Sequence, residues 1–369
     1  MSPYAQITGW GMAVPERVLT NVEIAQMVET SDEWIFARTG IHERHIAGEE
    51  DTTASLATQA ALKALEVAGL KPSAVDLIIV STSSPEYIFP ATACLVQDQL
   101  GASKAGAFDL LAACSGFIYA LNTATQAIQT GDAQSALVIG SETLSRLGDW
   151  KDRNSCILFG DGAGAFVLQA SEERSGLLSG VMHSDGSGGD LLILPGGGSA
   201  HPTTFETVHQ GMHYIQMNGR EVFRFATRVM AQATREAVNK AGLGMQEIQL
   251  VIPHQANLRI IESAVKSLDI PMERCFINLD RYGNTSTASI PIATCEAIDQ
   301  GRLKPGDLAV MVGFGAGLTW GAAVIEWSGP VLGIRKVRPY YIRFYARLRS
   351  ILLRFLRHID SWVWGRRMR

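Results

Sequence analysis

The chain has 369 residues, enough for two to three domains, and 47% of them are hydrophobic, which excludes a disordered or collagen-like protein. The net charge of −4 conceals a division, because the residues from 335 onward carry a net +10 and the remainder carries −14. The five cysteines are odd in number and never spaced as C-x-x-C, so we predict no disulfide framework, no metal site and a reducing, cytoplasmic setting.

An internal repeat with an offset of 173 residues is visible before residue 328. Residues 68–79 read Ala-Gly-Leu followed by a short apolar strand, and residues 241–252 repeat that pattern. Residues 136–140 and 309–313 show the same offset, and residues 164–168 and 321–325 echo each other at a smaller one. Short strands that are apolar throughout are covered on both faces, so the repeat predicts a layered α/β fold made of two similar halves.

We expect three parts: residues 1–173 with the nucleophile, residues 174–328 with its partners, and a basic extension, residues 329–369. If the two halves pack face to face, equivalent strand ends meet near a pseudo-twofold axis. Residues 81–84 and 254–257 would then lie close together.

Cys114 is the candidate nucleophile. It follows an apolar strand and precedes a long uncharged helix within residues 110–131. An enclosed helix start offers free N–H groups and positive potential, so we expect it to lower the pKa of the Cys114 thiol. The alternative is that Cys114 is a small core residue. That is our interpretation of the other four: Cys94, Cys156, Cys275 and Cys295.

Two polar residues of the second half are candidate partners of the thiol. His254 directly follows the apolar residues 250–253, where a loop side chain projects into any cleft at the strand ends, although a lone histidine is more often structural. Asn284 follows a turn glycine and precedes a helix of small residues, so it is either a helix cap or a site residue. A thiolate, an imidazole and an amide could together form an acyl thioester and stabilise a developing negative charge.

Two glycine-rich segments complete the pattern. Residues 159–164 resemble part of a dinucleotide fingerprint, but residues 165–168 continue as a strand where a helix is required, so we reject that cofactor. Residues 313–317 either place backbone N–H groups near the nucleophile as an oxyanion hole or form only a tight turn.

From about Ile7 to Trp327 the sequence resembles the β-ketoacyl-acyl-carrier-protein synthase III family. Six segments carry the resemblance: residues 30–41 (TSDEWIFARTGI), 112–117 (AACSGF), 159–164 (FGDGAG), 254–260 (HQANLRI), 283–286 (GNTS) and 315–321 (GAGLTWG). The resemblance implies a thiolase-like fold with two βαβαβαββ-type halves in an α-β-α-β-α core. It also implies an acyltransferase that needs no cofactor.

The implied reaction is a decarboxylative condensation of a short acyl-CoA, first of all acetyl-CoA, with malonyl-acyl carrier protein at the start of fatty-acid synthesis. Cys114 would carry the acyl group, His254 and Asn284 would hold the thioester carbonyl, and the N–H groups of Cys114 and Ala316 would form the oxyanion hole. The alternatives are a starter-unit or secondary-metabolite condensing enzyme or acyltransferase of the same fold, a thioester hydrolase, and a non-enzymatic scaffold.

The same resemblance assigns the binding residues. Trp34 and Arg153 would enclose the CoA adenine, for which an indole and a guanidinium plane are suited. Phe89 would close the acyl pocket from the neighbouring subunit of a homodimer and favour a short primer. The remaining assignments are Thr30, Arg38, Gly219 and Asn257 for the CoA tunnel, and Arg224, Arg259 and Lys266 for the carrier protein.

The basic extension lies beyond the resemblance. On a helical projection one face holds Tyr341, Phe344, Tyr345, Leu348, Ile351, Leu352, Phe355, Ile359, Trp362 and Val363, opposite Arg343, Arg347, Arg354 and Arg357. This pattern predicts a basic amphipathic helix that either lies on an anionic membrane surface, with Trp362 and Trp364 as anchors, or docks on the acidic body or a partner protein. No motif accompanies the charge, so we predict no nucleic-acid binding.

Overall fold

Two mixed sheets form the centre of the computed structural model, which describes residues 4–329 and 339–367. The first sheet has the strand order β1-β7-β6-β4-β5 and the second has the order β11-β12-β13-β8. The strands of the first sheet are β1 (Tyr4–Ala13), β4 (Leu77–Ser81), β5 (Gly106–Leu110), β6 (Ser135–Glu142) and β7 (Gly162–Ser171). Those of the second are β8 (Gly176–Ser184), β11 (Leu250–Pro253), β12 (Leu308–Gly315) and β13 (Thr319–Glu326).

The second sheet repeats the first. The parallel pair β4–β6 corresponds to β11–β12, and the antiparallel pairs β6–β7 and β7–β1 correspond to β12–β13 and β13–β8. The register repeats as well, because Leu77 lies opposite Ala136 and, 173 residues later, Leu250 lies opposite Ala309. The predicted pair of similar halves is therefore confirmed, while the division at residues 173 and 328 stays a prediction.

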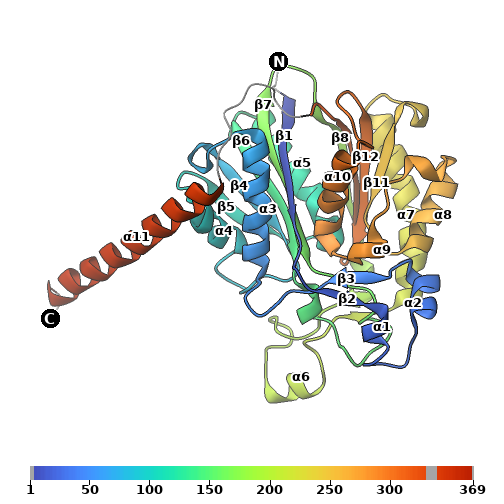
Figure 1. The fold of residues 1–369 in the computed structure, drawn as a ribbon, viewed down its shortest axis with the longest axis horizontal. Coiled ribbons are helices and arrows are strands. Elements are labelled where there is room, and N and C mark those ends of the chain that lie inside the picture. The colour runs from blue at the N-terminus through green and yellow to red at the C-terminus, as the bar shows by residue number, and fades with distance from the viewer. Residues whose placement is uncertain (1–3, 330–338, 368–369) are drawn as a thin grey trace.

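Helices separate and cover the two sheets, which gives the predicted α-β-α-β-α layers (Figure 1). The helices α3 (Thr53–Ala68) and α4 (Thr92–Leu100) cover the outer face of the first sheet. The helices α7 (Gly219–Lys240) and α8 (Leu258–Leu268) cover the outer face of the second. Between the sheets lie α5 (Gly116–Gln129) and α10 (Ser289–Asp299).

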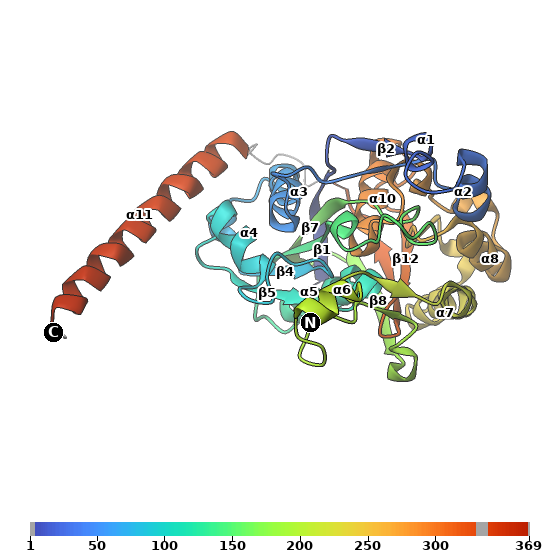
Figure 2. The same cartoon turned by 90° about the horizontal axis from the view of Figure 1, so that it is seen from below.

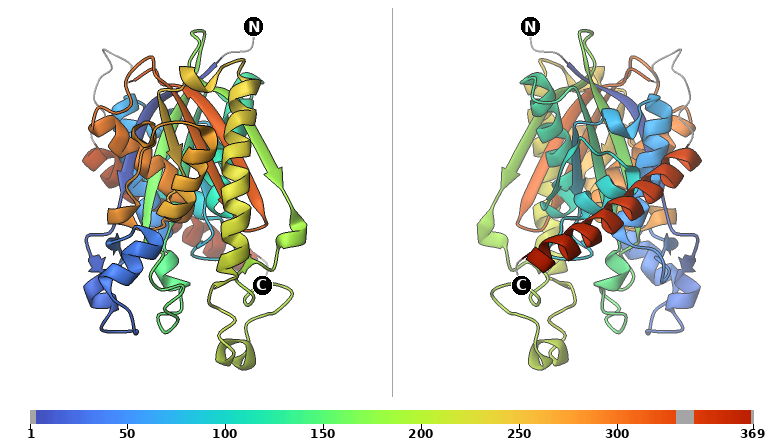
Figure 3. Two further views of the ribbon diagram at one scale, coloured as in Figure 1. Left: turned by 90° about the vertical axis from the view of Figure 1, so that its right-hand side faces the viewer. Right: turned by 90° about the vertical axis from the view of Figure 1, so that its left-hand side faces the viewer.

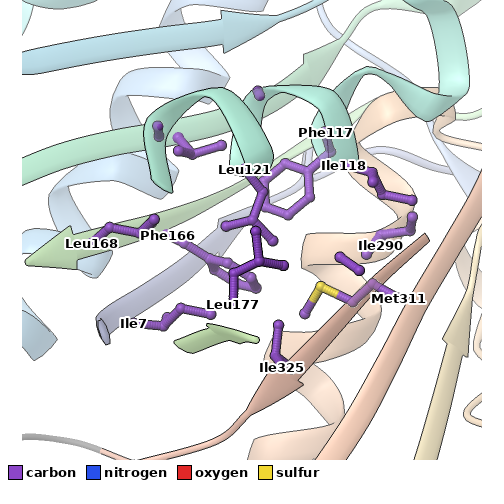
Figure 4. Packing of buried hydrophobic residues seen from close by; sticks show 14 of the residues in the cluster. Ile7, Phe117, Ile118, Leu121, Phe166, Leu168, Leu177, Ile290, Met311 and Ile325 are labelled. Atoms are coloured by element: carbon purple, nitrogen blue, oxygen red, sulfur yellow. The ribbon is translucent and has the colours of Figure 1, made fainter. Parts of the chain in front are cut away.

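The central layer is packed from both sheets at once. Phe117 and Leu121 of α5 meet Phe166 from the first sheet and Met311 and Ile325 from the second (Figure 4). Each of these side chains is fully buried, and burial of a side chain of this size stabilises the fold by about 1.5–3 kcal/mol. The α5 helix lacks charged residues, and nine of its fourteen residues are buried between the sheets, as its uncharged sequence predicts.

Smaller elements gather at one end of the sheets. The helices α1 (Asn21–Ile24), α2 (Asp32–Thr39) and α9 (Leu279–Tyr282) lie there with the hairpin of β2 (Val18–Thr20) and β3 (Glu43–His45) (Figure 1). The α2 helix ends at Gly40 with φ of 79°, and a Cβ on Gly40 would lie 2.5 Å from Leu258 Cβ. This close approach holds α2 against the start of α8. A protruding segment carries α6 (Phe205–His209) (Figure 3). The short strand β9 (Leu192–Ile193), before this segment, pairs with β10 (Gln216–Met217), after it.

The predicted C-terminal helix is present as α11 (Pro339–Arg367). It starts beside α4 and projects away from the layered body (Figures 1 and 2). Among the helices of the described residues, none has both the length and the apolar character to cross a bilayer.

Candidate active site

A cavity of about 450 Å³ connects the two halves of the molecule. Cys114 from the first half and His254 and Asn284 from the second line its inner part. Phe314 also lines the cavity, which reaches Trp34 on α2. The three residues that the sequence selects for chemistry therefore share one cavity.

Cys114 lies in a short 3₁₀ turn, Ala113–Ser115, directly before α5. Burial raises the pKa of its thiol to about 12, the Ser286 hydroxyl acts in the opposite direction, and nearby Glu142 raises the pKa further. The expectation of a lowered thiol pKa is wrong for the free protein, because loss of hydration outweighs the positive potential at the helix start. The thiol of Cys114 is therefore protonated in the free protein at physiological pH.

The glycine segment of β12 lies against the backbone of Cys114. A Cβ on Gly315 would lie 2.6 Å from the Cys114 backbone nitrogen, a distance that only glycine permits. The Thr319 hydroxyl can donate its proton to the carbonyl of Ala112, at 3.0 Å, or of Ala316, at 2.9 Å, and so lies between the two segments. Ala316 and Cys114 also line the same small pocket. An oxyanion hole made of their two N–H groups is compatible with this position and stays a prediction.

His254 follows β11 and is buried beside Phe314. Its Nδ1 lies 2.7 Å from the Ser289 hydroxyl, which also accepts a hydrogen bond from the Gln255 N–H at 3.3 Å. Burial lowers the pKa of His254 to about 3, so the ring is neutral at physiological pH. When Ser289 donates to Nδ1, the ring proton is on Nε2. The sequence did not single out Ser289, because only the fold brings the start of α10 to the histidine.

Hydrogen bonds of its backbone and of its side chain fix the position of Asn284. Its N–H donates to the Leu158 carbonyl at 2.8 Å, and its carbonyl accepts from the Gly160 N–H at 3.0 Å. Its Oδ1 accepts from the Ser286 N–H at 2.8 Å, a local turn contact, whereas the residue that caps the following helical turn is Thr285. The cap interpretation is therefore wrong, and the amide Nδ2 is the atom that can donate to a bound group.

Glu142 is a buried carboxylate near the nucleophile that sequence reasoning missed. Its carboxylate accepts hydrogen bonds from the Ser83 N–H and from the Ser84 and Thr82 hydroxyls. Burial raises the pKa of Glu142 to about 7 despite these bonds. A signal existed in the sequence, because a single acid ends the otherwise uncharged strand of residues 135–142.

Substitution Glu142→Gln is expected to make Cys114 more reactive at alkaline pH. Above about pH 7 the carboxylate is ionised and disfavours the thiolate, whereas glutamine is neutral at every pH. We expect iodoacetamide to alkylate Cys114 roughly threefold to tenfold faster in the variant at pH 8.5. Below pH 6 the two rates should converge, because Glu142 is then protonated. Peptide mapping identifies the modified cysteine, and equal rates at pH 8.5 would contradict the electrostatic role.

The repeat gives the nucleophile a structural counterpart. The offset of 173 residues places Thr287 where Cys114 stands in the other half. Ala113 and Ser286 are equivalent too, and both have positive φ, 45° and 49°. The Thr287 hydroxyl donates to Ser81 Oγ at 2.9 Å, and Ser81 is the counterpart of the histidine. The two turns thus share a backbone conformation, and only one carries a thiol.

The outer part of the cavity ends at an indole that has two guanidinium groups close to its ring. The Arg38 guanidinium carbon lies 4.2 Å from the Trp34 ring centroid, and that of Arg153 lies 5.0 Å away. Asn257 Nδ2 donates to the Arg38 carbonyl at 2.9 Å, which links α2 to the start of α8. Of the residues assigned to CoA, the cavity lining includes Trp34, Arg38, Gly219 and Asn257 but neither Thr30 nor Arg153.

The three cations assigned to the carrier protein are exposed on the neighbouring helices α7 and α8. Arg259 lies at the cavity mouth, with its guanidinium 5.7 Å from the Phe223 ring centroid. Arg224 is paired with Glu221 at 2.9 Å, and Lys266 lies near the end of α8. The three cations therefore lie on the helices beside the cavity mouth, and one of them, Arg224, already forms an ion pair with Glu221.

A small apolar pocket of about 100 Å³ adjoins Cys114. Sequence reasoning missed its apolar walls, which come from Leu144, Leu147, Phe159, Leu192, Ile193, Leu194 and Ile215. Phe89 is not among them; it is 84% exposed in a surface segment with Tyr87 and Ile88. Cys94 is also exposed, so its interpretation as a core residue is wrong, whereas Cys156, Cys275 and Cys295 are buried as expected.

Comparison with known proteins identifies the family of the chain. The family model described as 3-oxoacyl-[acyl-carrier-protein (ACP)] synthase III matches residues 108–186, and the model of its C-terminal part matches residues 238–327. Together the matches include all three residues of the inner cavity. The chain is 57% identical to the beta-ketoacyl-[acyl-carrier-protein] synthase III of Desulfitobacterium hafniense over 322 residues, which cover 87% of this chain and 97% of the relative.

Solved structures show the same fold. The 3-oxoacyl-[acyl-carrier-protein] synthase III of Aquifex aeolicus is 50% identical, with a TM-score of 0.81 over 88% of this chain and all of that chain. The priming β-ketosynthase of the R1128 polyketide pathway is 34% identical, with a TM-score of 0.83 over 89% of this chain and 98% of that chain. These identities, together with the fold and the matched site segments, show that the chain belongs to the 3-oxoacyl-[acyl-carrier-protein] synthase III family of condensing acyltransferases.

Proposed function

We propose that the protein condenses a short acyl-CoA with malonyl-acyl carrier protein, giving a 3-oxoacyl-acyl carrier protein, CoA and CO₂ at the start of fatty-acid synthesis. The observation that carries this proposal is the single cavity that joins Cys114, His254 and Asn284 to the arginine-flanked Trp34. Relatives at 50–57% identity are beta-ketoacyl-[acyl-carrier-protein] synthases III, which supports the same reaction. The two thioesters and the protein supply all the reacting groups, so we propose no cofactor.

The first half-reaction transfers the acyl group to Cys114. The sulfur attacks the thioester carbonyl of the acyl-CoA, and the backbone N–H groups of Cys114 and Ala316 stabilise the tetrahedral oxyanion. The carbon–sulfur bond to CoA then breaks, and the proton from the thiol ends on the CoA sulfur. His254, whose lowered pKa makes it a weak base, keeps its Nε2 proton for the second half-reaction.

The second half-reaction forms the carbon–carbon bond. His254 Nε2–H and Asn284 Nδ2–H donate to the thioester carbonyl of the malonyl group, and loss of CO₂ leaves an enolate whose oxygen they stabilise. The enolate carbon attacks the acyl-Cys114 carbonyl, and the Cys114 thiolate leaves and regains a proton from solvent. Neutral donors suit this step, since a carboxylate beside the enolate oxygen would repel its charge.

Substitution Trp34→Ala is expected to raise the KM for acyl-CoA about tenfold and to leave kcat unchanged. We expect the indole and the two arginines near it to bind the adenine and not to contact the reacting carbon. The KM for malonyl-acyl carrier protein should not change, because that substrate lacks the adenine. Phe36→Ala is the matched control, since Phe36 is a half-exposed aromatic on the same helix that stacks on His42. Equal effects of both variants would contradict the assignment.

We further propose that the working unit is a homodimer in which Phe89 closes the partner's acyl pocket. Phe89 is exposed and lies outside the pocket of its own chain. β5 is an edge strand of its sheet, and Phe108 and Leu111 are exposed at that edge. An unpaired edge strand with exposed apolar side chains favours pairing with a second copy. The size of the pocket then supports a short primer such as acetyl.

Mass spectrometry of the protein with a panel of acyl-CoAs tests the proposed function. We expect a mass increase on Cys114 with short acyl-CoAs, and formation of 3-oxoacyl-acyl carrier protein when malonyl-acyl carrier protein is added. A stable acyl-enzyme without condensation would indicate an acyltransferase only, and rapid thioester hydrolysis would indicate a hydrolase. A preference for longer or branched acyl groups would favour a starter-unit role like that named for the R1128 priming enzyme.

A further inference from the structure

Among the described residues, the contacts of the C-terminal helix α11 with the body lie in its first part, between Ile342 and Arg354. Ala346 packs over Gly101, where a Cβ on the glycine would lie 3.2 Å from Ala346 Cβ. Ile342 packs beside the outer core of the first sheet, and the Ser350 hydroxyl donates to Asp98 Oδ2 at 2.7 Å. Beyond these contacts the helix projects from the body (Figures 1 and 2).

The apolar face of α11 points away from the body. Eight large apolar side chains on it are 42% to 66% exposed: Phe344, Tyr345, Leu348, Ile351, Leu352, Phe355, Leu356 and Ile359. The residues that contact the body lie on the opposite side of the helix, at 100° per residue. The predicted docking on the body is thus made by the opposite side of α11, and among the described residues the apolar face stays uncovered. The side chains of Tyr341, Arg343, Trp362, Val363 and Trp364 lie outside the described residues.

Cations flank the exposed apolar face. Arg347 and Arg354 lie along one edge and Arg349 along the other. From residue 335 onward the sequence holds eleven basic residues and one acid. Among the described side chains, the acid recorded near these arginines is Asp98, 3.8 Å from Arg354. The helix thus combines an uncovered apolar stripe with positive charge on both sides.

We propose that α11 binds parallel to the surface of an anionic lipid bilayer. Its apolar stripe would enter the boundary between head groups and acyl chains, and the long arginine side chains would reach the lipid phosphates. Its 29 residues, about 43 Å long, would lie in the plane of the surface. The proposal does not depend on the reaction that the body catalyses.

Two other occupants of the apolar face fit less well. Pairing two copies of α11 would bring together two helices that each carry seven basic residues and one acid, a net charge of +6. A carrier protein has the right charge, but it must reach the cavity mouth at α2, α7 and α8. That mouth lies on the opposite side of the body from α11 (Figures 1 and 3).

Cosedimentation of the full chain with vesicles tests the proposal. We expect binding to phosphatidylglycerol vesicles, little binding to phosphatidylcholine vesicles, and weaker binding as salt is raised. The double variant Leu352→Glu with Phe355→Glu should reduce binding at least tenfold, because it places charge in the apolar stripe. The matched control is Phe205→Glu with Val208→Glu, which adds the same charge at exposed apolar residues of α6 and should bind normally.

Activity and mass measurements complete the test. All variants should condense soluble substrates at the rate of the unchanged protein, which shows that the body is folded. The proposal is overturned if the full chain does not bind phosphatidylglycerol vesicles or if both double variants lose binding equally. It is also overturned if light scattering shows that the α11 variant dissociates an oligomer without affecting vesicle binding, since the occupant would then be a second copy.

Discussion

Substitution Cys114→Ala is expected to abolish the acyl-enzyme and to slow condensation by about 10⁴-fold or more. Cys114 supplies the sulfur that carries the acyl group, and none of the other residues lining the cavity is a cysteine. Decarboxylation of malonyl-acyl carrier protein should continue, because the enolate forms at His254 and Asn284. Mass spectrometry of the protein after incubation with acetyl-CoA, and measurement of released CO₂, check the two parts separately.

Cys295→Ala is the matched control for that variant. Cys295 is a buried cysteine on α10 that does not line the cavity, so its replacement should cost some stability and leave the acyl-enzyme intact. If Cys114→Ala still accumulated a covalent acyl group, another nucleophile would carry the reaction. If Cys114→Ala also stopped decarboxylation, the assignment of that step to His254 and Asn284 alone would be incorrect.

Substitution Gly315→Ala should lower kcat about 10²-fold to 10³-fold. The added Cβ would lie 2.6 Å from the Cys114 backbone nitrogen and 3.0 Å from Ala113 Cβ, so the nucleophile turn or the glycine segment must move. Either movement displaces an N–H group from the oxyanion. Loss of one donor of this kind has an effect of that size in other enzymes. Single-turnover acylation with acetyl-CoA measures the affected step directly.

Gly313→Ala provides a close comparison two residues away on the same strand. A Cβ there would meet Cys114 O, Ile290 Cδ1 and His254 Cβ at 3.4 to 3.5 Å, which are ordinary contacts. We expect its acylation rate to fall by less than about tenfold, with thermal unfolding near that of the unchanged protein. Similar acylation rates in the two variants would show that the approach of Gly315 to Cys114 is unrelated to catalysis.

The repeated strands could be predicted because their sequence is determined by burial on both faces. Residues 77–81 and 250–253 are nearly all apolar, and the structure places both in sheets covered by helices. The meeting of Cys114, His254 and Asn284 followed from the same repeat, since equivalent strand ends converge between the halves. Local motifs and the topology they imply were therefore sufficient for the inner cavity.

Properties that depend on the complete surroundings of a group could not be predicted. The helix start beside Cys114 suggested a lowered pKa, but the extent of burial that raises it is set by the second half of the chain. Ser289 and Glu142 each contact the site through segments that are distant in sequence. The helical pattern of residues 339–367 likewise predicted which residues share a face, but not which side of the helix faces the body.

The counterpart of the nucleophile turn explains why a duplicated scaffold has a single reaction centre. The repeat places Glu142 at the position of Gly315, so the place where a second oxyanion would be stabilised is already filled by an acid. Substitution Thr287→Cys would add a thiol there, but no N–H groups would be available to stabilise an oxyanion beside it. The two halves of the molecule thus have similar backbones. A few side chains decide that only one half carries the reaction centre.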